Sequence, residues 1–379
     1  MAEERDAVPA DAEREWDAID IDDIGGFDVA GIGEPFDEDL WLDGLARKVG
    51  MGHLSDALPG SVPPSYLYAL VTIGVLELVL GAYSYAIGEP VIYLQNPFFL
   101  LQPIGLLAAV YGSRSLRRRY HEVTVEMRIR NRTDDPERLT NVIPSWLPWT
   151  VFLSVVAVNY VRLFALGGPV AVYQDANLAA VIGWTVANPV WASIATQFFT
   201  VYVAVTLIAP RRLRDSDVGV DFLDPEGLGG LRPIGELVKH AYYYVVAGLV
   251  AIGLVLYGPA IVGIEWERTT ATNLIFTTVW LSSVATVGYA VFTLHQFMRD
   301  EKRRELHRLR AMEERLVEDR WGVGFQRASS EKQGVLEGVR RRMERVSATQ
   351  EYPATFSIWS QLLLSIVIPK AVQLVVARI

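Results

Sequence analysis

Residues 66–87 read YLYALVTIGVLELVLGAYSYAI, and this stretch decides the fold class. Its only charged side chain is that of Glu77. A helix of about 20 apolar residues crosses the roughly 30 Å hydrocarbon core of a bilayer, and it pairs its own backbone amides there. The stretch therefore predicts a transmembrane helix.

Six further apolar stretches follow, and the chain is 51% hydrophobic overall. Together they predict an all-α protein, a polytopic bundle of six to seven transmembrane helices. The alternative is a water-soluble helical core, but seven stretches of membrane-spanning length argue against it. The second and fourth stretches contain Pro97, Pro103 and Pro189, so we expect kinked helices there. The expected spans are residues 66–87, 93–112, 146–166, 178–209, 241–264, 273–297 and 356–377.

Basic residues gather on one side of these spans. Residues 1–65, 113–145, 210–240 and 298–355 hold 31 of the 35 Lys and Arg residues, whereas the alternate connections hold only Arg268. Short loops rich in Lys and Arg stay in the cytoplasm. The pattern predicts a multi-pass protein of the cell membrane with a cytoplasmic N-terminus.

The composition differs sharply between the N-terminal segment and the rest. Residues 1–65 hold 17 acidic and 4 basic residues, and we expect them to form a mostly disordered cytoplasmic tail. Only 5 of the 35 basic residues are Lys, and acidic surfaces with Arg in place of Lys suit a salt-rich cytoplasm, which indicates a halophilic archaeon. The chain has no Cys, which excludes disulfides and thiolate sites.

Residues 16–24 of this tail alternate Asp with bulky apolar residues, in the order WDAIDIDDI. One interpretation is a docking peptide that folds on a basic partner or on the arginine-rich loops of the same protein. The other is a solubilising tail whose apolar residues are incidental.

Two cytoplasmic segments carry candidate contacts to lipid headgroups. The loop 113–145 begins with a basic cluster that includes Arg117, Arg118 and Arg119. The loop 210–240 contains DPEGLGGLRP at 224–233. Glycines before a helix N-terminus could bind an anionic group, although the lysine and spacing of a phosphate-binding loop are missing. The alternative is an interfacial turn that leads back into the bilayer.

Residues 298–355 predict a cytoplasmic helical hairpin. Leu306, Leu309 and Leu316 form one apolar seam, and Leu336, Val339, Met343 and Val346 form another. These seams would pack against each other in an antiparallel pair, or each would face another subunit. Arg340, Arg341 and Arg342 precede residues 356–379, the seventh membrane helix, where anionic lipid would attract them. Because Pro369 and Lys370 lie deep within that helix, a re-entrant or interfacial helix is an alternative there.

Charged and polar residues inside the spans are the candidate intramembrane sites. Glu77 and Arg162 lie at similar depths in the first and third spans, so we expect an ion pair between them, either as a structural link or as an ion-coordinating site. Polar residues recur every fourth position in the sixth span and in the seventh, and such stripes either line a water path or join helices. The candidates are Glu77, Asn159, Arg162, Ser282, Gln361 and Lys370.

No motif of a zinc protease, nucleotide-binding loop or nucleophile elbow occurs, and the five His residues lack ligand spacing. We expect no catalytic residue, metal, cofactor or nucleic-acid partner. With its inward N-terminus, its 224–233 turn and its hairpin before a last span that contains Trp, Ser and Gln, the chain resembles uncharacterised multi-pass membrane proteins of haloarchaea. That resemblance implies no activity and no site residues.

The expected parts are a tail at 1–65, a six-span bundle at 66–297, a hairpin at 298–355 and a last helix at 356–379. The pattern favours a sensing or scaffolding protein whose partners are the lipid bilayer, a soluble protein on the tail or hairpin, and further copies of the chain. The alternative is an ion channel or transporter with a path between spans one, three, six and seven. A membrane enzyme is the third class, and no residue pattern favours it.

Overall fold

The computed structural model describes residues 39–60, 62–89, 91–264, 270–316 and 330–351, together with Val367 and Ala371. Every secondary-structure element within these ranges is a helix, which confirms the all-α prediction for the described residues. The acidic residues 16–24, Gln361, Lys370 and nearly all of the seventh expected span lie outside them.

Five helical stretches of the described residues are long and apolar enough to cross a membrane. Their outward faces are apolar: Leu78 is 74% exposed, Val161 70% and Phe164 66%. Extended apolar surfaces of this kind mark contact with a partner or with lipid, so the helices suggest a membrane location. The stretches are α4 (Pro64–Ala86), α9 (Trp146–Ala165), the run from α11 to α13 (Leu178–Arg214), α14 (Arg232–Ile261) and α15 (Thr270–Leu316).

The second expected span is divided rather than continuous. It forms α5 (Ile92–Gln95), a 3₁₀ turn (Pro97–Leu100) and α6 (Leu101–Glu126). The side chain of Asn96 accepts a hydrogen bond from the Phe98 amide at 3.1 Å and so begins a new turn. The expected break therefore occurs at Pro97. Pro103 lies in the first turn of α6, where a missing N–H leaves no bond unmade.

Part of the expected disordered tail is helical. Residues 41–57 form α2 (Trp41–Lys48) and α3 (Met51–Ala57), so the disorder prediction is wrong for them. The acidic composition hides an amphipathic pattern in α2: Leu42 and Ala46, four residues apart, are both fully buried. The Trp41 ring packs edge-on against Trp149 of α9, with ring centroids 5.2 Å apart.

A buried ion pair fixes α2 to the bundle. Arg114 of α6 lies 2.7 Å from the carboxylate of Asp43, and their side chains are 8% and 0% exposed. The same carboxylate accepts the amides of Leu40 and Ser65 at 3.0 and 2.9 Å. The guanidinium also donates to the Ser65 hydroxyl at 3.2 Å. The Asp43 carboxylate is thus bonded to groups from the residue before α2, from α4 and from α6.

The run from α11 (Leu178–Ile182) through α12 (Asn188–Val203) to α13 (Ala209–Arg214) is interrupted by two π-helical segments. These are Gly183–Ala187 and Ala204–Ile208, and each ends two residues before a proline. This run contacts α2, α4, α6, α9, α14 and α15, and it is the most deeply buried of the five stretches.

The first π-helical segment explains the role of Asn159. Pro189 has no N–H, so the carbonyl oxygens of Trp184 and Thr185 lack their usual backbone donors. Asn159 of α9 donates to the Trp184 oxygen at 2.9 Å, and the Tyr160 hydroxyl donates to the Thr185 oxygen at 3.0 Å. Asn159 is therefore a structural link between α9 and the central run.

The loops 113–145 and 210–240 pack into one unit, which we call the cap. It contains α7 (Ile129–Arg132), α8 (Pro136–Thr140) and α13. Arg212 donates to the carbonyl oxygens of Arg138 and Asn141 at 2.7 and 2.8 Å. Bonds of this kind tie one loop to the other, so the cap is a folded unit rather than a pair of free loops.

A second contact within the cap joins Thr133 and Asp134 to Asp217. The Thr133 hydroxyl donates to the Asp217 carboxylate, as does the Asp134 amide at 3.2 Å. These hydrogen bonds, from the hydroxyl first and the amide second, hold the pKa of Asp217 below its ordinary value. The ionised carboxylate is therefore the form that this contact favours.

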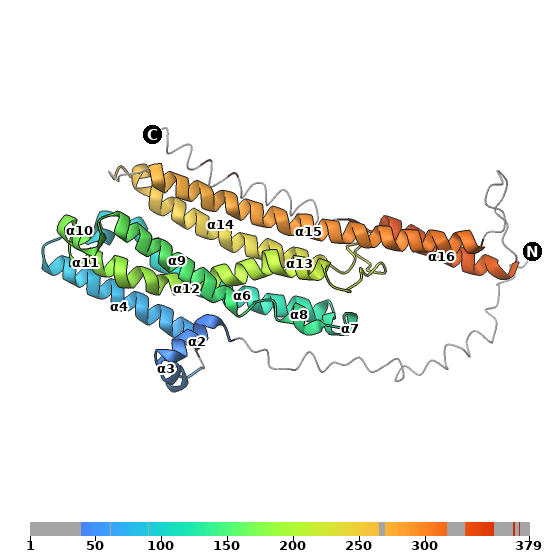
Figure 1. Ribbon diagram of the computed structural model, residues 1–379, viewed down its shortest axis with the longest axis horizontal. Helices are drawn as coiled ribbons and strands as arrows, with labels where there is room; N and C mark the ends of the chain where they lie inside the picture. Colours follow the sequence, from blue (N-terminus) through green and yellow to red (C-terminus); the bar gives the residue numbers. More distant parts are fainter. Residues whose placement is uncertain are drawn as a thin grey trace, which may run out of the picture. The chain divides into compact units, whose positions relative to one another are not determined.

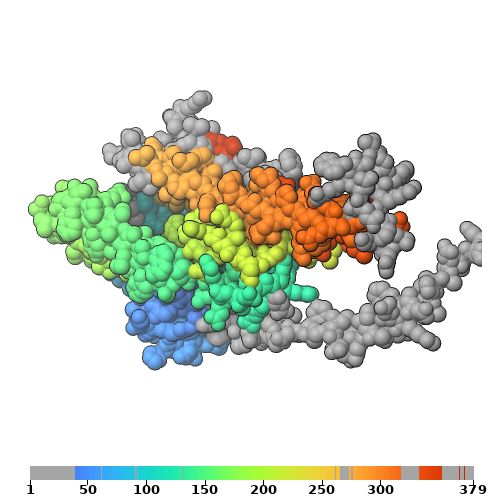
Figure 2. Space-filling model, turned by 45° about the vertical axis from the view of Figure 1, so that its right-hand side comes forward, coloured from blue at the N-terminus to red at the C-terminus, as the bar shows by residue number. Residues whose placement is uncertain are grey.

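Helix α15 continues without a break from its apolar part into a hairpin with α16 (Ser330–Ala348), as Figure 1 shows. The helices are antiparallel: Arg340 lies 2.8 Å from Glu313, and Arg342 lies 2.7 Å from Glu305. All seven expected seam residues are buried or half-buried, so the seams pack against each other within one chain. Figure 2 shows α15 (orange) against the surface of the segment that contains α13 (yellow-green).

The base of the hairpin is bonded to the cap. The amide of Gln350 donates to the Gly227 carbonyl at 2.8 Å, and His295 of α15 donates to the Glu351 carbonyl at 2.8 Å. The ammonium of Lys302 donates to the carbonyls of Ser347 and Thr349, both at 2.8 Å. One backbone hydrogen bond thus joins the hairpin base to the cap, and two side chains of α15 hold the end of α16 and the residues that follow it.

Candidate functional site

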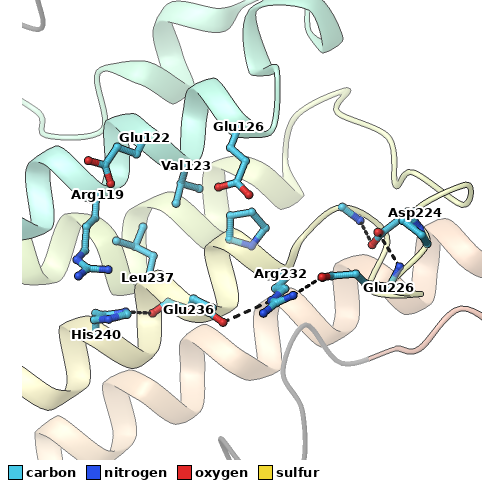
Figure 3. Close-up of a pocket in the computed structure, with 13 residues that line it drawn as sticks. Arg119, Glu122, Val123, Glu126, Asp224, Glu226, Arg232, Glu236, Leu237 and His240 are labelled. Atoms are coloured by element: carbon cyan, nitrogen blue, oxygen red, sulfur yellow. Dashed lines mark hydrogen bonds and ion pairs between the residues drawn. The ribbon is translucent and has the colours of Figure 1, made fainter. Parts of the chain in front are cut away.

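A cavity of about 510 Å³ opens between the end of α6, the loop 224–233 and the first turns of α14 (Figure 3). Helix α6 contributes Arg119, Glu122, Val123 and Glu126, whose spacing of three and four residues places them on one helical face. Helix α14 contributes residues of its first three turns, among them Glu236 and His240. The other lining residues are Asp224, Pro225, Glu226, Gly230, Arg232, Pro233 and Leu237.

The loop 224–233 is shaped by three glycines with positive φ, Gly227, Gly229 and Gly230, at 68°, 66° and 70°. Such backbone angles are strained for other residues. At Gly229 a side chain would also overlap a methyl group of Val220. The glycines therefore allow the loop to curl its amides inward around Asp224.

The Asp224 carboxylate already occupies the position that an external anion would take. One of its oxygens accepts the Glu226 amide at 3.0 Å, and the other accepts the amides of Leu228 and Gly230 at 3.1 and 2.8 Å. Because these amides are used by the loop's own side chain, the geometry argues against an anionic headgroup at this turn. The alternative interpretation, a structural turn before α14, fits this geometry.

Arg232 is likewise engaged by its neighbours. It forms an ion pair with Glu226 and lies 3.4 Å from Glu236, and Figure 3 shows both contacts. His240 donates from Nδ1 to the Glu236 carbonyl at 2.8 Å, since a carbonyl can only accept. Two of the three basic groups at the cavity therefore already have partners.

The cavity is acidic overall. Five carboxylates line it, from Glu122, Glu126, Asp224, Glu226 and Glu236, against two arginines and one histidine. Glu122 and Glu126 are exposed on α6, and Figure 3 draws no contact for them. A cationic group is the ligand class that such walls attract. The described residues at the cavity contain no nucleophile paired with a base, and no cluster of metal-binding side chains occurs among the described residues.

The expected headgroup arginines have separate roles. Arg117 is half-buried and Arg118 exposed on α6, whereas Arg119 lines the cavity. Arg340 and Arg342 pair with α15, and Arg341 lies 3.6 Å from Glu337 of its own helix. At least two of the six thus hold the hairpin together.

The intramembrane candidates do not form one site. Glu77 is hydrogen-bonded to Tyr93, and the guanidinium of Arg162 lies 5.0 Å from the centre of the Trp184 ring. The expected Glu77–Arg162 ion pair is therefore wrong, because each side chain has another partner in the fold. Ser282 is exposed on α15.

The polar stripe of the sixth span is satisfied within its own helix. The hydroxyl of Thr278 donates to the Leu274 carbonyl at 2.8 Å, and that of Thr286 to the Ser282 carbonyl at 2.7 Å. In an apolar helix, a threonine hydroxyl commonly donates to the carbonyl oxygen four residues earlier in this way. Both hydroxyls therefore have a partner within α15 itself.

Sequence reasoning missed the network around Asp43 and Arg114. Arg114 was visible only as the first member of a basic cluster, and Asp43 only as one of many acids. The informative signal was the helical spacing of Leu42, Asp43 and Ala46, which places a carboxylate on the buried side of α2.

Comparisons of the chain with protein-family models, with curated proteins and with solved structures found no match, so its geometry carries the functional inference.

Proposed function

We propose that the chain is an integral membrane protein of six to seven spans that senses or scaffolds, with its N-terminus in the cytoplasm. The cap and the hairpin form its interaction surface. The observation that carries this proposal is the continuity of α15, one helix that joins an apolar span to the hairpin. The basic residues of the cap and hairpin support their cytoplasmic placement.

The helix contacts support this proposal over its alternative, a channel or transporter. Its path was expected between spans one, three, six and seven. Helix α4 packs on α2, α3, α6 and α12, α9 on α12 and α10, and α15 on α13, α14 and α16. The two cavities described here lie at the cap and hairpin rather than among the apolar spans.

A crosslinking experiment tests the interaction surface. A photoactivatable residue replaces Val335, which is 57% exposed on α16, and a matched control replaces Leu78, which is 74% exposed on α4. We expect one soluble protein to crosslink at position 335 and only lipid at position 78. Equal capture at both positions, or none at 335, would contradict the proposal.

A deletion and a flux assay complete the test. The deletion covers residues 1–38 only, because removal of Asp43 would break the buried network. Loss of the partner would assign it to the tail, and retention would assign it to the hairpin. In reconstituted liposomes we expect no ion flux above that of empty liposomes. Flux that Glu77→Gln abolishes would establish the channel alternative instead.

A further inference from the structure

A second cavity, of about 420 Å³, lies between the cap and α16. One wall is apolar and comes from the cap: Val220, Phe222 and Leu223, the last of which is 70% exposed. The other wall is a face of α16 with Arg341, Arg342 and Arg345, and with Gly338 between them and the hairpin tip. Asp221 also lines the cavity, and its carboxylate accepts the Leu223 amide at 2.9 Å.

The arginine wall carries excess positive charge. Arg341 and Glu337, 3.6 Å apart, are 75% and 71% exposed, and an exposed pair of this kind is held weakly. Arg345 is exposed and has no ion pair within the described residues. Arg342 is bound to Glu305. Two guanidinium groups are therefore available to a carboxylate, for which their planar donors are well suited.

An occupant of this cavity needs carboxylates on one edge and bulky apolar side chains on the other. In an extended peptide, neighbouring side chains point to opposite sides. The sequence at 19–22, Ile-Asp-Ile-Asp, places its isoleucines on one edge and its aspartates on the other, and Trp16 and Ile24 flank it. We propose that residues 16–24 of the chain itself occupy the cavity between Leu223 and Arg345, as an internal peptide that an external partner must displace.

The attachment point of the tail is compatible with this proposal. Leu40 belongs to the same apolar core as Val220, which lines the cavity. Fourteen residues, 25–38, separate the acidic segment from Asp39, and at up to about 3.5 Å per residue they reach roughly 50 Å. Tethering on this scale gives a local concentration on the order of millimolar, so a weak contact suffices.

The inference deepens the proposed function by adding regulation of the interaction surface, but its test needs no partner protein. The chain has no Cys, so introduced cysteines are the only thiols. The test pair is Ala18→Cys with Gly338→Cys in the full-length protein in lipid nanodiscs, because residue 18 shares an edge with Asp20 and Asp22 in an extended segment and Gly338 lies on the arginine wall. The control pair is Ala18→Cys with Val49→Cys, because Val49 is 54% exposed and much nearer to residue 18 along the chain. Random collision would favour the control pair.

We expect the intramolecular disulfide of the test pair to form about tenfold faster than that of the control pair, as local concentration in a docked state requires. The double substitution Arg341→Glu with Arg345→Glu should remove that advantage. Its matched control, Arg303→Glu with Arg310→Glu, changes two exposed arginines on α15 that lie outside the cavity, and should leave the advantage intact.

Three results would overturn the inference. Equal rates for the two cysteine pairs would show that residues 16–24 do not dock here. A disulfide between two copies would assign the cavity to a second chain. An advantage present in neutral nanodiscs and lost with anionic lipid would assign the arginines to headgroups. All of these experiments use the purified protein without a partner. If docking of residues 16–24 is disproved, the proposed function is therefore still tested separately by crosslinking at position 335.

Discussion

Removal of one partner of the Asp43–Arg114 ion pair should release α2 from the bundle. In Arg114→Met the carboxylate of Asp43 stays 0% exposed in the folded state but loses its cationic partner at 2.7 Å. Breaking one side of a buried pair costs about 3–5 kcal/mol. The two amides from Leu40 and Ser65 remain bonded to the carboxylate, so we expect the lower part of that range.

The assay follows opening of α2 through a single introduced thiol. Ala46 is fully buried in α2, and Ala46→Cys reacts with a maleimide only when α2 is released. Each 1.4 kcal/mol changes the equilibrium between bound and released α2 about tenfold. If α2 loses about 3 kcal/mol of stability in its bound position, labelling therefore becomes roughly 10²-fold faster, provided that opening and closing are fast. The labelling rate of the unfolded chain sets the upper limit.

Arg119→Met is the matched control, since Arg119 is an exposed arginine on the same helix. Arg119→Met should change the free energy of α2 release by no more than about 0.5 kcal/mol, as for other exposed substitutions. If Arg114→Met changes labelling by less than about twofold, or if Arg119→Met matches it, the ion pair does not hold α2, and the reasoning from burial fails.

Four further predictions concern orientation, the spans and the cap. An impermeant maleimide should label Leu223→Cys only from the cytoplasmic side and Tyr85→Cys only from outside; the reverse pattern contradicts the orientation. In thermal unfolding, Glu77→Gln should couple with Tyr93→Phe and not with Arg162→Met, and a double-mutant cycle measures both couplings. Tyr160→Phe should cost about 0.6–2 kcal/mol, because the Thr185 carbonyl loses its donor, and less in a Pro189→Ala background that restores the backbone N–H; equal costs in both backgrounds would disprove the role given to Pro189. Gly227→Ala should cost about 1–2 kcal/mol from its positive φ, while Gly229→Ala should cost more because its new methyl group also meets Val220; an equal loss of melting temperature would contradict this.

Much of the fold was predictable because lipid imposes simple rules. The length and apolarity of α4, α9 and α15 follow directly from the sequence, as do the two hairpin seams, since Leu306 and Leu309 in one and Val339, Met343 and Val346 in the other recur at helical spacing. These features depend on local periodicity, which a single sequence displays.

The remaining features depend on contacts between distant residues. Glu77 is hydrogen-bonded to Tyr93, which lies beyond the short connection after α4, and not to Arg162 of α9. The predicted depth in the membrane could not distinguish these two partners. The glycines at 227–230 indicated an anion site, but whether Asp224 fills that site is decided by side-chain geometry. Sequence composition also concealed α2, since its acids dominate the average over residues 1–65.

The length of α15 has a mechanical consequence. Its 47 residues extend about 70 Å at 1.5 Å per residue, and roughly half of that length lies beyond the apolar part. A tilt of about 5° around its midpoint displaces the far end by roughly 3 Å, which is comparable to an atomic diameter. A change in bilayer thickness that tilts α15 would thus move the end of α15 in the hairpin sideways.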